Sequence, residues 1–184
     1  MDDVRHPALA PYELHGVRVL HDDVVRIEEH DVTTPDGRGF TMAVTVSRGF
    51  VVVVPVLTTG EVVLVHQYRH TLGRITLETP AGAIDPDEEP IVAVHRELAE
   101  ETFLRAGSIE HLGTFADNPG RSTGYAHMYL ALDCVDDPSA RAHEPTEPVR
   151  MTLAAAVAAI GGAVDSTSAS LALLLAWRRL EPAT

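Results

Sequence analysis

The sequence has little cysteine, little positive charge and no long hydrophobic run. Its one cysteine, Cys134, cannot form an intrachain disulfide, which fits a reducing, cytoplasmic compartment. There are 14 Lys and Arg against 27 Asp and Glu, so the formal net charge is -13. Because nucleic-acid phosphates are bound by basic surfaces, no nucleic-acid partner is expected. The apolar run Phe50–Leu57 is too short to span a bilayer, and no signal peptide is evident at the start, so no membrane role is expected.

What is present is sufficient for one folded domain with a small extension. The chain has 184 residues, of which 45% are hydrophobic. Strand-like and helix-like stretches are mixed without a regular alternation, which predicts the α+β class or a mixed-sheet sandwich. The expected strands are 17–32, 40–46, 49–57, 61–66, 76–79, 108–115 and 126–132, and the expected helices are 90–105, 153–160 and 166–180. Residues 34–37 read Thr-Pro-Asp-Gly, a strong turn signal between the first two strands, and residues 133–148 are expected to form a polar loop.

The helix predicted over residues 90–105 gathers carboxylates on one side. Glu97 and Glu101 are four residues apart and share a face, and Glu100 lies beside them. Like charges at this spacing repel, so a helix of this kind needs another source of stability. One interpretation is a solvated acidic surface. The other is a site for a hard divalent cation, because Mg²⁺ takes carboxylate oxygens together with substrate phosphates and water.

The spacing of these residues resembles the Nudix box. The box begins at Gly82, continues after five residues with Glu88, and after seven more ends in Arg96-Glu97-Leu98-Ala99-Glu100-Glu101. Three further fragments, Gln67-Tyr-Arg69, Glu78-Thr-Pro-Ala-Gly82 and Asn118-Pro-Gly120, are similar to the ADP-ribose and nucleotide-sugar pyrophosphatase branch of the Nudix hydrolases. The alternative is a Nudix domain that binds nucleotide metabolites without cleaving them. The complete set Arg96, Glu97, Glu100 and Glu101 favours a hydrolase, because a binding domain has no need for all four.

The resemblance implies a fold and an assembly. The fold is an α/β/α sandwich with a mixed central sheet and an N-terminal antiparallel extension. The Nudix domain would occupy residues 47–184, and residues 1–46 would carry a β-hairpin extension. In this branch the N-terminal strands help to form a homodimer, so a homodimer is expected here.

The resemblance also implies roles at the metal. Glu97 and Glu101 would bind Mg²⁺, with Mn²⁺ as an alternative, and the backbone carbonyl of Ala81 would be a further ligand. Glu100 would be a more distant ligand or would position the attacking water. Arg96 would orient the glutamates, and Gly82 would support the site with it.

Roles toward the substrate follow in the same way. Arg69 matches a position that contacts the diphosphate or terminal sugar, and Arg121 adds positive charge to the loop after Pro119-Gly120. The branch uses a further glutamate after the box as general base or metal ligand, and Glu144 and Glu147 are both candidates. The expected substrate is a nucleoside diphosphate such as ADP-ribose, GDP-mannose or another nucleotide sugar, with the diphosphate of a specialised metabolite as an alternative. The expected products are a nucleoside monophosphate and a sugar phosphate.

One box position departs from the family pattern. The glycine that normally ends the helix is Phe103 in this chain. We therefore expect one continuous helix through Arg105, capped by Gly107 in a left-handed conformation, with the Phe103 ring buried.

Overall fold

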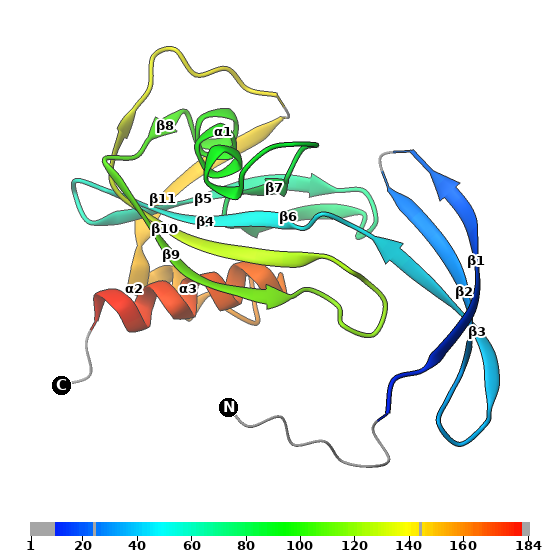
Figure 1. Ribbon diagram of the computed structural model, residues 1–184. Helices are drawn as coiled ribbons and strands as arrows, with labels where there is room; N and C mark the ends of the chain where they lie inside the picture. Colours follow the sequence, from blue (N-terminus) through cyan, green and yellow to red (C-terminus); the bar gives the residue numbers. More distant parts are fainter. Residues whose placement is uncertain (1–9, 24, 144, 182–184) are drawn as a thin grey trace. The chain divides into compact units, whose positions relative to one another are not determined.

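The computed structural model describes residues 10–23, 25–143 and 145–181 (Figure 1). The chain divides into two compact units, which are described separately here. The first contains the residues up to Arg48 together with Ala116–Gly124, and the second contains Gly49–Phe115 and the residues from Tyr125 onward. The predicted division at residue 46 stays a prediction, because the first unit also takes in the segment 116–124.

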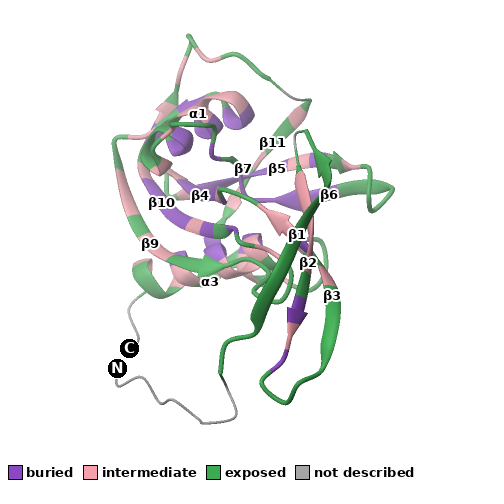
Figure 2. Cartoon of the chain, turned by 45° about the vertical axis from the view of Figure 1, so that its right-hand side comes forward, coloured by how far each residue is buried: buried purple, intermediate pink, exposed green. Residues whose placement is uncertain are grey.

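The first unit is a three-stranded antiparallel sheet. Its strands, in the spatial order β1-β2-β3, are β1 (Glu13–Asp22), β2 (Arg26–Thr33) and β3 (Gly39–Val46). The predicted turn between β2 and β3 is confirmed: the Gly37 N–H donates to the Thr34 carbonyl over 2.9 Å, and Gly37 has φ 86°. The single strand predicted over residues 17–32 is instead two strands. The edge strand β1 is exposed along its whole length (Figure 2).

The second unit is built on an eight-stranded mixed sheet. Its central order is β11-β5-β4-β10-β8, while β6 pairs with β5, β7 with β4 and β9 with β10. β4 and β10 run parallel, whereas β4 and β5 run antiparallel. The strands are β4 (Phe50–Leu57), β5 (Glu61–Arg69), β6 (Arg74–Glu78), β7 (Ala81–Ala83), β8 (Leu104–Arg105), β9 (Ser108–Ala116), β10 (Tyr125–Asp136) and β11 (Thr146–Thr152).

Helices cover both faces of this sheet. α1 (Pro90–Thr102) packs on one face, and α2 (Leu153–Ala158) and α3 (Thr167–Leu180) pack on the other (Figure 1). The run Val51–Val54 in β4 is fully buried because its residues point alternately into the two cores. The predicted α/β/α sandwich with a mixed sheet is confirmed. None of the helices among the described residues combines the length and apolar character of a membrane span.

Three strands of the second unit were not predicted: β7, β8 and β11. β8 lies in the stretch 104–105, where the helix was expected to continue. β11 begins inside the stretch 133–148, which the sequence indicates as a polar loop, and it pairs along its whole length with β5. β7 has only three residues, which pair with the first part of β4. These strands hold the segments on either side of α1.

The predicted end of α1 is wrong. The helix stops at Thr102, and Phe103 caps it in the left-handed conformation, with φ 58° and ψ 29°. The Phe103 side chain is 40% exposed rather than buried. Gly107 is not in the left-handed region; a Cβ there would lie 2.9 Å from the Asp133 Cβ, so this glycine permits close approach to β10 instead. Phe103 thus takes the position and the backbone conformation of the missing box glycine.

This conformation makes a prediction about stability. A non-glycine residue in the left-handed region costs about 1–2 kcal/mol, and Phe103 recovers little of that by burial. Phe103→Gly is therefore expected to unfold at a higher temperature than Phe103→Ala by about 2–4 °C, since both lose the ring but only glycine is relieved of the strain. Thermal melts of the two variants measure the difference. Equal melting temperatures would show that the strain is absent.

Candidate active site

A pocket of about 320 Å³ lies in the second unit, where α1 faces β7 and the end of β5. Its lining is rich in charged side chains and contains few apolar ones. It is lined by Gln67, Arg69, Ala81, Gly82, Ala83, Asp85, Arg96, Glu97, Glu100, Glu101 and His143. The structure therefore brings together seven of the ten residues that the sequence predicts for the site.

Two carboxylates enter this pocket from the buried face of α1. The buried residues of the helix are Ala93, Val94, Glu97, Leu98, Glu101 and Thr102, which follow a helical period. Glu97 and Glu101 thus occupy core-facing positions, with only 7% and 6% of their surfaces exposed. Burying a carboxylate carries a cost that partners must offset, and here Arg96 donates to Glu97 and the Ala81 N–H donates to Glu101. Two carboxylates kept beside a polar pocket in spite of that cost suit a binding site.

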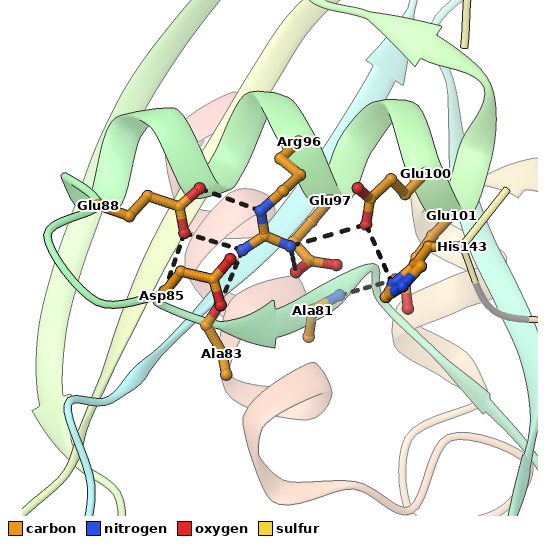
Figure 3. Close-up of polar contacts among 9 residues, drawn as sticks. All are labelled: Ala81, Ala83, Asp85, Glu88, Arg96, Glu97, Glu100, Glu101 and His143. Carbon is orange, nitrogen blue, oxygen red and sulfur yellow. Dashed lines mark hydrogen bonds and ion pairs between the residues drawn. The ribbon is translucent and has the colours of Figure 1, made fainter. Parts of the chain in front are cut away.

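Glu101 is held by the backbone of the neighbouring strand. The Ala81 N–H donates to Glu101 Oε2 over 2.9 Å (Figure 3). Ala81 itself is fixed by β7, where it lies opposite Val52 of β4. The pairing of β7 with β4 therefore sets the position of the Glu101 carboxylate.

Gly82 leaves the space that Glu97 occupies. A Cβ at residue 82 would lie 1.9 Å from Glu97 Oε1 and 2.2 Å from its Cδ, far closer than atoms can approach. The glycine is therefore required by the close approach of the carboxylate, since Gly82 does not have a positive φ. This explains in physical terms why the first position of the box lacks a side chain.

Arg96 contacts three carboxylates: Glu88, which precedes α1, and Glu97 and Glu100 within it. Its guanidinium donates to both oxygens of Glu88 over 3.0 and 2.9 Å, to the Ala83 carbonyl over 2.8 Å, and to Glu97. Glu100 Oε2 lies 3.7 Å from Arg96 Nη1. Figure 3 shows the guanidinium between Glu88 on one side and Glu97 and Glu100 on the other. The hydrogen bond to Glu88 raises the pKa of Arg96 and lowers that of Glu88. Arg96 thus offsets the repulsion within the glutamate cluster.

The Arg96 contact predicts a pH-dependent stability. The arginine holds the pKa of Glu88 below its ordinary 4.5, so the folded protein favours the charged carboxylate. This stabilisation is complete above the unfolded pKa and is lost as the pH falls through the lower folded value. Glu88→Gln is expected to lower the melting temperature by about 2–4 °C near neutral pH. Melts of both proteins down to about pH 3 should show this gap closing, and a gap that persists there would contradict the assignment.

Arg69 reaches the pocket from β5. It forms a two-pronged ion pair with Glu78 of β6, with Nε–Oε1 at 2.9 Å and Nη2–Oε2 at 2.8 Å. The Arg69 guanidinium holds the pKa of Glu78 below its usual range. A cation of β5 therefore lines the same pocket as the glutamates of α1.

The structure does not assign the other three predicted residues to the pocket. Glu147 lies on β11 with its side chain 82% exposed, and its Oε2 lies 3.7 Å from His66 Nδ1. Glu144 is outside the described residues. Arg121 belongs to the first unit, where its carbonyl accepts the Thr45 N–H over 2.7 Å. The roles of all three stay predictions.

Four residues of the pocket are additions to the predicted set: Gln67, Ala83, Asp85 and His143. Gln67 and Asp85 belong to stretches quoted for the resemblance, so their positions in those stretches were the available signal. The sequence alone gives His143 no role, because the ten histidines form no cluster with the spacing of metal ligands. In the structure His143 Nδ1 lies 3.9 Å from Glu100 Oε2, at the pocket.

The oxygen atoms at the pocket suit a hard cation, but the protein does not supply all of its ligands. Among the described residues, no group of three or more His, Cys, Asp or Glu is arranged to hold a metal ion. Mg²⁺ does not require one, since it commonly binds one or two carboxylates and completes its shell with water and substrate phosphates. Glu97 and Glu101, with the backbone of Ala81 beside them, fit that requirement.

Comparisons with known proteins agree with this geometry. A protein-family model described as "NUDIX domain" matches residues 47–169. The chain is 34% identical over 108 residues to a methanol dehydrogenase activator of Bacillus methanolicus, covering 59% of this chain and 58% of that protein. It is 31% identical over 114 residues to an ADP-ribose pyrophosphatase of Bacillus subtilis, covering 62% of each. The chain thus spans about three fifths of the length of these curated relatives.

A solved structure shares the architecture. The crystal structure of an ADP compounds hydrolase superposes with a TM-score of 0.80 at 21% sequence identity, over 95% of this chain and 97% of that one. At this identity the likeness establishes the fold.

Proposed function

Because this chain belongs to the Nudix family, we propose that it hydrolyses the diphosphate linkage of a nucleoside diphosphate joined to a second moiety, in a reaction that requires Mg²⁺. The observation that carries the proposal is the pair of buried carboxylates, Glu97 and Glu101, one helical turn apart in a polar pocket. The products would be a nucleoside monophosphate and, from a nucleotide sugar, a sugar phosphate.

The metal would be held by oxygen atoms from two elements. Glu97 and Glu101 of α1 would be ligands, together with the backbone carbonyl of Ala81. Mn²⁺ is an alternative ion, because it accepts the same hard oxygen donors. When bound, the ion would offset charge on the phosphate oxygens and lower the pKa of the attacking water.

The chain's own residues would then bind, orient and accept a proton. Arg96 would keep Glu97 and Glu100 in fixed orientations through its hydrogen bonds and ion pair. Arg69 would bind the anionic substrate from the β5 side of the pocket. Glu147, one of the two candidates for the general base, does not line the pocket, whereas Glu100, expected to position the attacking water, does. We therefore assign general-base catalysis to Glu100, with Glu144 retained as the alternative from the loop.

ADP-ribose is the first substrate to test, because a relative with that activity by name shares 31% identity with this chain. A panel of ADP-ribose, GDP-mannose, other nucleotide sugars and dinucleoside diphosphates should be incubated with Mg²⁺ and, separately, with a chelator. Chromatography should detect a nucleoside monophosphate only when the metal is present. Binding of these compounds without cleavage would overturn hydrolysis in favour of a binding domain.

We further propose that the protein is a homodimer. Support comes from β1, an edge strand that leaves Leu14, Val17, Val19 and Leu20 exposed to solvent. An exposed apolar edge strand is a surface that pairing with a second copy would cover. Light scattering at micromolar concentration should give about twice the 19.8 kDa chain mass. A mass near that of one chain would sink the proposal.

A further inference from the structure

The side chain of Arg69 folds back along the β5–β6 hairpin. In the register of that hairpin, Arg69 lies opposite Arg74, whereas Glu78 lies opposite Val65. Positions 65 and 69 are separated by about 13 Å along the strand. The two side chains nevertheless meet in a two-pronged ion pair. Each must therefore extend along the sheet toward the other.

Between the positions of Arg69 and Glu78, one cross-strand pair lies on the same face of the hairpin, and it is formed by Gln67 and Thr76. These two residues are directly opposite each other, so their side chains share a face with Arg69 and Glu78. Thr76 Oγ1 lies 2.6 Å from Glu78 Oε1 and donates to it. Gln67 lines the pocket together with Arg69. The arginine head is thus drawn along β5 toward the pair that contains the pocket residue Gln67.

Glu78 is held in one position by burial and by hydrogen bonds. It is 8% exposed, and its carboxylate accepts hydrogen bonds from Nε and Nη2 of Arg69 and from Thr76, which is itself 2% exposed. Arginine has several rotatable bonds, and holding it in one geometry requires a fork-shaped partner of this kind. Glu78 does not line the pocket, so any influence on a ligand must act through Arg69.

Resting on the function proposed above, we propose that Glu78, supported by Thr76, is a positioning residue that holds the Arg69 guanidinium ready to bind the diphosphate of the substrate. Without Glu78, the Arg69 guanidinium would lose the two-pronged contact that fixes its geometry, and binding would have to order it first. Preorganisation by Glu78 removes that cost, so it strengthens binding of the substrate without taking part in the bond cleavage.

A double-mutant cycle separates this role from simple structural support. The four proteins are the wild type, Glu78→Gln, Arg69→Met and the double variant. Two quantities are measured: KM and kcat for ADP-ribose, and Kd for its non-hydrolysable α,β-methylene analogue with Mg²⁺. Glu78→Gln should raise KM and Kd about tenfold while kcat changes by less than about threefold. In the Arg69→Met background the same substitution should change neither quantity.

Thermal stability gives an independent check on the pair. Arg69→Met leaves the buried Glu78 carboxylate without its counter-ion, which is destabilising. Adding Glu78→Gln removes that charge and should recover part of the lost melting temperature. Asp165→Asn is the matched control. It removes the carboxylate partner of Arg74, which is an arginine of β6 and does not line the pocket. It should leave KM and Kd unchanged.

The outcomes are distinct. Unchanged KM and Kd in Glu78→Gln, or an equal effect of this substitution with and without Arg69, would overturn the positioning role. If Glu78→Gln does not fold, Thr76→Val is tested in the same cycle, with a smaller rise in Kd expected and no change counting against the proposal. A wild type that binds the analogue but cleaves nothing overturns the hydrolase function, while the four Kd values still decide the role of Glu78. A wild type that binds neither this analogue nor any compound of the substrate panel overturns both.

Discussion

Glu101→Gln is expected to lower kcat about 10²- to 10⁴-fold at saturating Mg²⁺ while leaving the fold intact. The substitution removes the negative charge but keeps the length of the side chain. The amide oxygen of glutamine can still accept the Ala81 N–H that now donates to Glu101 Oε2 over 2.9 Å. Since a neutral amide is buried at lower cost than a carboxylate, the melting temperature should not fall.

Two measurements distinguish loss of metal binding from loss of the folded structure. Titration with Mn²⁺, followed by its electron paramagnetic resonance signal, should show weaker binding to Glu101→Gln than to the wild type. Glu110→Gln is the matched control, because Glu110 lies on β9 in an ion pair with Arg179, away from the pocket lining. Near wild-type turnover by Glu101→Gln at saturating metal would show that Glu101 is not a ligand.

The elements that could be predicted are those whose signal is local. Val51–Val54 and the core positions of α1 carry an apolar pattern that fixes the type of element before any tertiary contact forms. β11 has no such signal: Thr146–Thr152 contains Pro148 and charged residues, and it is a strand because the edge of β5 is available for pairing. β7 has three small residues, and only its pairing with β4 makes it a strand.

The end of α1 was predicted wrongly for a different reason. Intrinsic preference disfavours a left-handed phenylalanine, so the sequence favours a longer helix. The following residues decide otherwise: β8 pairs with β10, and the Phe103 carbonyl accepts the Asp137 N–H over 2.8 Å. These contacts require the chain to turn at residue 103. The tertiary structure therefore overrides the local preference of Phe103.

The candidate site likewise contains residues whose positions follow from local spacing and residues whose positions depend on tertiary contacts. Glu97, Glu100 and Glu101 lie on one helix, so their spacing alone predicts that they gather. The contact of Arg69 with Glu78 depends on the hairpin register and on two side chains that extend toward each other, which no spacing rule specifies. His143 comes from a loop whose course is set by β10 and β11, so its position could be known only from the structure.

Gly82→Ala is expected to lower kcat about 10²-fold with little change in melting temperature, because it displaces a ligand rather than the backbone. The added methyl group would lie 1.9 Å from Glu97 Oε1, and the flexible carboxylate is the group that must move. Gly82 has no positive φ, so alanine adds no backbone strain. Gly162→Ala is the matched control, since its Cβ would meet the Ala159 carbonyl oxygen at an ordinary contact distance of 3.5 Å.

A second substitution tests whether Glu97 is the group displaced. Glu97→Asp shortens that side chain by one methylene and leaves room for the methyl group of Gly82→Ala. If the two residues conflict only through this contact, Gly82→Ala should reduce kcat and Mn²⁺ affinity much less in the Glu97→Asp background than in the wild type. Independent, multiplicative losses in the double variant would mean that Gly82 serves the site by another route, such as the path of β7 itself.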